Sequence, residues 1–150
     1  MTWFIGTSTT MSADGKTLFG KASAVVKRTL QPSSHQIVEE LRRSDGLASK
    51  STLRQRGNTP VFDVADAAAT FSGTVTFNGD PYGKSAWSYT IAMTSGKLLS
   101  GTGGWSDAGL QTAKVVSDAS GKETARIAEQ FTVSTEAAAE AAAAGFKPAR

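Results

Sequence analysis

The chain has 150 residues, no cysteine and one histidine, His35, and its formal net charge is +3. This length corresponds to one ordinary domain that can bury a core without disulfide bonds. The lack of cysteine excludes a disulfide framework and a thiolate metal site, and a lone histidine excludes a histidine-rich metal centre. We therefore expect neither a metal nor a cofactor.

The charge distribution gives no sign of a nucleic-acid or membrane partner. The basic residues are scattered apart from short pairs such as Lys27-Arg28 and Arg42-Arg43, which we interpret as part of a solvated surface. No apolar run reaches the roughly 18 residues of a membrane span. The stretch from Met1 to Thr10 lacks a basic start followed by an apolar segment, so we expect no signal peptide and a cytoplasmic location by default.

Turn-forming residues interrupt the sequence at nine nearly regular points. Asp14-Gly15 is the strongest hairpin signal, because both residue types tolerate positive φ. The other turn signals lie at 31–34, 44–46, 57–58, 66–68, 78–81, 95–96, 106–109 and 118–121. They separate segments of roughly 7–12 residues, a spacing typical of strands in a β-sandwich or β-barrel.

Apolar and polar residues alternate within several of these segments. One face of residues 87–93 carries Trp87, Tyr89, Ile91 and Met93, and the other carries Ser88, Thr90 and Ala92. Residues 71–77 and 124–133 alternate in the same way. A period of two predicts antiparallel strands with one buried face.

The C-terminal segment has a different pattern. Ser134, Thr135 and Glu136 precede a run rich in alanine that ends at Gly145, as expected for a capped helix. We therefore predict a barrel over residues 1–133, a short helix over 134–145 and a flexible tail over 146–150.

The short connections favour one topology. An all-β, antiparallel up-and-down meander of about ten strands needs only tight turns, whereas a sandwich normally contains longer crossovers. Closure into a barrel removes the two edge strands that an open sheet would leave.

Several stretches resemble the calycin-like group, which includes lipocalins, fatty-acid-binding proteins and small bacterial barrels. The opening Trp3–Thr7 is similar to an aromatic–glycine first strand, and the stretches 71–79, 87–89 and 99–103 are similar to the glycine-spaced later strands. A weaker similarity, through Gly101-Thr102-Gly103, links the chain to allene oxide cyclase and dirigent-type barrels. The resemblance implies a cavity for one small ligand.

Two carboxylates fall on faces that we predict to point inward. Glu39 lies between Ile37 and Leu41 on the more apolar face of 35–43, and Glu129 shares a face with Phe131. An inward carboxylate is costly unless it is paired or protonated. Each glutamate is therefore either a general acid or base, or the partner of a cation such as Arg43. The sequence leaves both interpretations open.

Our leading prediction is a binding protein for a small hydrophobic or amphipathic molecule, because ligand sites are mostly apolar with few polar groups. The alternative is a cofactor-independent isomerase, cyclase or lyase that uses Glu39, Arg43 and Glu129. A third interpretation is a structural or self-associating barrel. The predicted ligand-contacting residues are Ile37, Leu41, Phe71, Phe77, Trp87, Tyr89 and Ile91.

Overall fold

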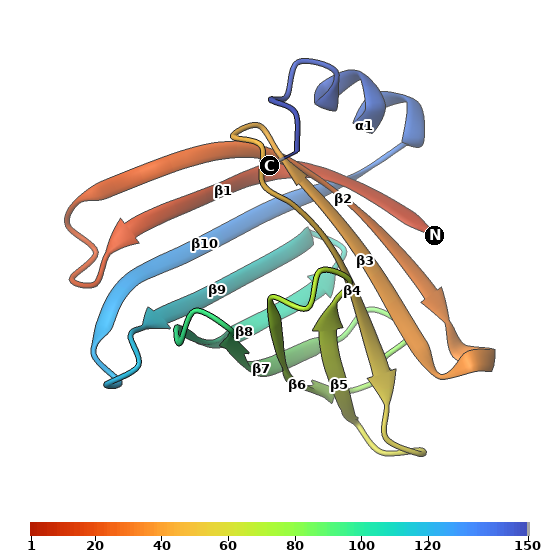
Figure 1. The fold of residues 1–150 in the computed structure, drawn as a ribbon. Coiled ribbons are helices and arrows are strands. Elements are labelled where there is room, and N and C mark those ends of the chain that lie inside the picture. Colours follow the sequence, from red (N-terminus) through yellow and green to blue (C-terminus); the bar gives the residue numbers. More distant parts are fainter. Residues whose placement is uncertain (150) are drawn as a thin grey trace.

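Ten antiparallel strands close into a barrel in the computed structural model, which describes residues 1–149 (Figure 1). The strands are β1 (Thr2–Ser12), β2 (Leu18–Gln31), β3 (Gln36–Arg43), β4 (Ala48–Gln55), β5 (Val61–Asp66), β6 (Phe71–Asn78), β7 (Ala86–Met93), β8 (Leu98–Ser106), β9 (Gly109–Ser117) and β10 (Glu123–Ser134). Each strand pairs with its neighbours in sequence, and β1 also pairs with β10. The predicted all-β meander and its closure are confirmed.

The connections between strands lie where the turn signals predict them. Gly15 adopts φ +74° between β1 and β2, and the Asp66 carboxylate accepts hydrogen bonds from the backbone N–H groups of Thr70 and Phe71. The inclusion of His35 in the segment predicted over 35–43 is wrong, because β3 begins at Gln36. Pro32 starts a 3₁₀ turn, Pro32–Ser34, that ends at His35 with φ +55°.

The barrel interior holds two apolar clusters. The first consists of the buried residues Ile37, Leu53, Phe62, Val64, Val75 and Phe77 from β3 to β6. The second consists of Phe4, Ala24, Val26, Leu110 and Phe131 from β1, β2, β9 and β10. Trp87 of β7 packs against both clusters. The apolar face of β7 therefore points inward, while Ser88, Thr90 and Ala92 are exposed.

The predicted helix lies against the outside of the barrel. Helix α1 (Glu136–Ala143) begins after Thr135, whose hydroxyl accepts a hydrogen bond from the Ala138 N–H at 3.1 Å. Its buried residues Ala139 and Ala143 pack with Val25 on the outer side of β2. Figure 1 shows α1 beside β1 and β2. No helix within residues 1–149 is long and apolar enough to span a bilayer.

The segment that follows α1 continues this contact. Phe146 is half-buried and packs against the cluster of Val25, Ala139 and Ala143, as do Trp3 and Ile5. It falls within the tail predicted over 146–150, whose last residue, Arg150, lies outside the described part of the chain.

Three strand glycines lie where neighbouring backbones approach each other unusually closely. A Cβ atom placed on Gly6, Gly73 or Gly101 would lie 1.9, 2.0 or 2.1 Å from a carbonyl oxygen of the adjacent strand. None of the three has a positive φ, so the constraint is space rather than backbone conformation. Glycine bends of this kind give a sheet the curvature that it needs to close.

We expect Gly73→Ala to lower the free energy of unfolding by about 1–3 kcal/mol, the usual cost of overpacking a tight site. Gly20→Ala is the matched control, because Gly20 also lies in a strand and a Cβ atom added there would meet nothing within 4 Å. Urea titration of both variants measures the difference. Equal stabilities would show that Gly73 does not limit the curvature.

Candidate functional site

Arg28 is a charged side chain enclosed by the barrel. It lies on the inner face of β2, and only 1% of its surface is exposed. Its guanidinium carbon lies 4.8 Å from the ring centre of Trp87 and 6.0 Å from that of Trp105. Cation–π attraction is strongest when the cation is desolvated, so both indoles stabilise the buried charge.

The carboxylate that balances Arg28 comes from the next strand. Arg28 and Glu39 are direct partners in the β2–β3 register, and Nη1 of Arg28 lies 3.2 Å from Oε2 of Glu39. The Glu39 side chain remains 30% exposed. Glu39 is therefore ion-paired, but its partner is Arg28. Arg43 instead pairs with Asp45 at the end of β3.

The position of Trp87 depends on a glycine in β8. Trp87 and Gly103 are cross-strand partners, and a Cβ on Gly103 would lie 2.4 Å from the indole nitrogen. The missing side chain at Gly103 therefore makes room for the ring that stacks on Arg28. The close approach of the Trp87 ring to the backbone at position 103 explains why a glycine lies there, on the inner face of β8.

The unequal burial of the two partners predicts unequal costs when one is removed. Glu39→Gln leaves the enclosed guanidinium uncompensated and should lower the free energy of unfolding by about 3 kcal/mol. Arg28→Met keeps much of the packing and leaves a carboxylate that water reaches, so we expect a loss of about 1 kcal/mol. Chemical denaturation of the two variants measures which substitution lowers the free energy of unfolding more. A larger loss for Arg28→Met than for Glu39→Gln would contradict this prediction.

A second polar group lies on the inner faces of β7, β9 and β10. Thr112 donates a hydrogen bond to Oε1 of Glu129 at 2.9 Å, and Nζ of Lys114 lies 3.3 Å from the same oxygen. Glu129 is only 8% exposed. Tyr89 interacts with Thr112 as well, which joins β7 to the group. Glu129 thus has a hydroxyl donor and a cation as partners.

The environment of Tyr89 keeps its phenol protonated. Burial raises the pKa of Tyr89 well above its usual range, and the negative charges of Glu129 and Glu39 raise it further. The phenol therefore remains neutral across the physiological pH range.

This pKa shift predicts a loss of stability in alkali. Below about pH 10 the phenol is protonated in both the folded and the unfolded chain, so it contributes no pH dependence. Above that pH the unfolded chain loses the proton first, and the free energy of unfolding should fall as the pH rises. The protein has two tyrosines, so absorbance titration of Tyr82→Phe isolates Tyr89. Ionisation of Tyr89 near pH 10 without unfolding would contradict the burial.

Several buried donors have no hydrogen-bond partner among residues 1–149. They are Nε and Nη2 of Arg28, Nε1 of Trp105 and the hydroxyls of Ser8 and Ser85. Ser8 lies directly opposite Glu129 in the β1–β10 register. A buried donor without a partner costs about 1–3 kcal/mol, so such a group needs an explanation.

The inward side of β7 is less enclosed than the parts of β5 and β6 that carry Val64 and Phe77. Val64 and Phe77 on β5 and β6 are at most 5% exposed. Trp87, Tyr89, Ile91 and Met93 are only half-buried, although they point into the barrel. Apolar side chains on this wall therefore keep surface that could contact a ligand.

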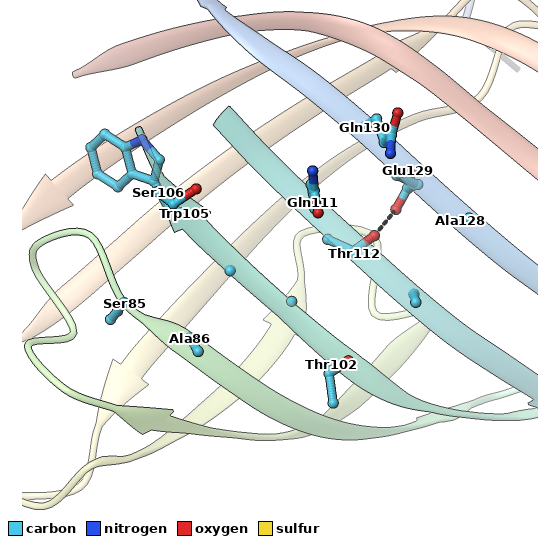
Figure 2. A pocket seen from close by; sticks show the side chains of 13 residues that line it. Ser85, Ala86, Thr102, Trp105, Ser106, Gln111, Thr112, Ala128, Glu129 and Gln130 are labelled. Carbon is cyan, nitrogen blue, oxygen red and sulfur yellow. Dashed lines mark hydrogen bonds between the residues drawn. The ribbon is translucent and has the colours of Figure 1, made fainter. Parts of the chain in front are cut away.

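Two open hollows lie on the barrel wall away from that apolar face. The larger, of about 600 Å³, spans the start of β7 and strands β8 to β10. Figure 2 shows the hydrogen bond between Thr112 of β9 and Glu129 of β10, and it also shows Trp105 on β8. Most of the side chains around it, such as Gln111, Ala113 and Gln130, are exposed. The smaller hollow, of about 410 Å³, lies over β4, β5 and β6.

The structure separates the predicted apolar contacts from the predicted charged residues. The second apolar cluster contacts Leu41, and the first cluster contains or contacts the other six predicted ligand-contacting residues, namely Ile37, Phe71, Phe77, Trp87, Tyr89 and Ile91. Glu39 and Glu129 form separate ion pairs, and Arg43 lies apart with Asp45. Of all these residues, only Glu129 contributes to the larger hollow.

The central residue of the site, Arg28, is absent from the residues predicted from the sequence. The interpretation of Lys27-Arg28 as a solvated pair is wrong for Arg28, whereas Lys27 does point outward, toward Glu40 at 3.9 Å. Alternation within β2 carries the missing signal, because Ala24, Val26 and Arg28 share one face. The sequence also gives no sign of the part played by Lys114, Thr112, Trp105 and Ser8. The pairing of β9 with β10 and of β7 with β8 brings the first three near predicted residues, and the closing β1–β10 pair does so for Ser8.

No group of acidic residues and histidine suited to a metal ion occurs within residues 1–149. Comparisons with protein-family models, with curated proteins and with solved structures found no match to this chain.

Proposed function

We propose that this protein is a calycin-like carrier that binds one small hydrophobic or amphipathic molecule inside the barrel. The observation that carries the proposal is the half-buried apolar wall of β7, which faces the interior. Small-molecule sites combine such apolar walls with a few polar groups that fix orientation. Here Arg28, Glu39 and Tyr89 would supply the polar contacts.

The pairing of the carboxylates supports binding over catalysis. A general base needs a carboxylate that can take a proton from a substrate. Glu39 is paired with Arg28, and Glu129 is paired with Lys114 and Thr112. Structural ion pairs of this kind are a sufficient reason for carboxylates inside a barrel.

Binding of the uncharged fluorescent dye Nile red tests the proposal. We expect it to bind with enhanced emission and to quench tryptophan fluorescence. Trp87→Ala should weaken binding by about tenfold or more, since truncating a buried aromatic contact costs more than about 1.4 kcal/mol. Trp3→Ala is the control, because Trp3 packs outside the barrel beside α1.

Circular dichroism establishes that both variants fold. A folded Trp87→Ala protein that binds the dye as tightly as the parent would show that β7 does not form the binding wall. Absence of dye binding to the parent would oppose the carrier proposal itself.

A further inference from the structure

The unpartnered donors around Arg28 specify the chemistry of a ligand head group. Nε and Nη2 of Arg28 and Nε1 of Trp105 can only donate hydrogen bonds. Arg28 is 1% exposed. A group that satisfies these atoms must carry hydrogen-bond acceptors.

The guanidinium has one edge that is paired with a carboxylate and a second, buried edge that has no hydrogen-bond partner among residues 1–149. Nη1 contacts Glu39 at 3.2 Å, whereas Nε and Nη2 have no hydrogen-bond partner among residues 1–149. Trp87 and Trp105 lie near the guanidinium, which leaves the Nε–Nη2 edge as the place where an acceptor oxygen would bind.

The two buried charged residues within residues 1–149, Arg28 and Glu129, each have a partner of opposite charge. Arg28 is compensated by Glu39, and Glu129 is compensated by Lys114. A ligand carboxylate would add an uncompensated negative charge close to Glu39, and like charges repel strongly where water is excluded.

We propose, on the basis of the carrier function above, that the unpartnered edge of Arg28 binds an uncharged acceptor such as an ester, ketone or amide carbonyl. The apolar part of the ligand then lies along the inward face of β7. The two lone pairs of a carbonyl oxygen can accept hydrogen bonds from Nε and Nη2 without disturbing the balance between Arg28 and Glu39. The protein would therefore select neutral carbonyl compounds over the corresponding carboxylates.

Displacement of Nile red by three ligands of matched chain length tests the selection. These ligands are a medium-chain methyl ester, the corresponding fatty acid at about pH 8, where its carboxyl is ionised, and an alkane. We expect the ester to bind at least about tenfold more tightly than either of the others, equivalent to about 1.4 kcal/mol. An alkane that binds as tightly as the ester, or a carboxylate that binds more tightly, would overturn the inference.

A charge variant separates head-group recognition from the greater hydrophobicity of the ester. Glu39→Gln removes the compensating charge, so the ratio of acid to ester affinity should rise by about tenfold. Glu40→Gln is the matched control, because Glu40 lies on the outer face of β3 with a 42% exposed side chain. The hydrophobicity of each ligand cancels when ratios are compared between variants. An unchanged ratio in Glu39→Gln would overturn the inference.

Arg28→Met gives an independent measurement if Glu39→Gln does not fold. Loss of the donors should weaken ester binding by about tenfold and leave alkane binding unchanged. Equal ester affinity in Arg28→Met and the parent would overturn the head-group inference. Failure of the parent to bind Nile red and all three ligands would instead reject the carrier function, so the two failures are distinguishable.

Discussion

The interior of this barrel is organised around one buried cation. Arg28 carries a permanent charge, and burying such a charge without partners is prohibitively costly. Glu39 supplies the counter-charge at 3.2 Å, and two indoles lie near the guanidinium. Glycine at 103 leaves the space in which Trp87 reaches this position. Strands β2, β3, β7 and β8 are thus tied to the same side chain.

Barrel closure is the second constraint, and it explains the distribution of packing. Gly6, Gly73 and Gly101 let adjacent backbones approach where any side chain would collide. The apolar residues of β3 to β6 form one buried cluster and those of β1, β2, β9 and β10 form another, with Trp87 touching both. The inward face of β7 remains only half-buried between them.

The polar groups inside the barrel are the basis for proposing recognition rather than chemistry. Glu39 and Glu129 each have a cation within 3.3 Å, and the raised pKa of Tyr89 keeps its phenol protonated. What stays without a partner among residues 1–149 is a set of donors, three of which can never accept a hydrogen bond. An interior that offers donors and apolar walls suits a ligand with an acceptor head and an apolar body.

The fold class, the nine turns, the C-terminal helix and the division of β7 into an apolar and a polar face could all be predicted from the sequence. These features depend on local rules, namely turn chemistry and a period-two alternation, which act within a few residues. The partners inside the barrel, by contrast, depend on how the strands pair and on closure of the sheet. Glu39 pairs with Arg28 because the β2–β3 register sets them opposite each other, whereas its sequence neighbour Arg43 pairs with Asp45. Trp87 and Trp105 lie on the paired strands β7 and β8, whereas Arg28 on β2 is far from both along the chain and meets them only because the sheet closes. Their shared site therefore depends on barrel geometry rather than on any local pattern.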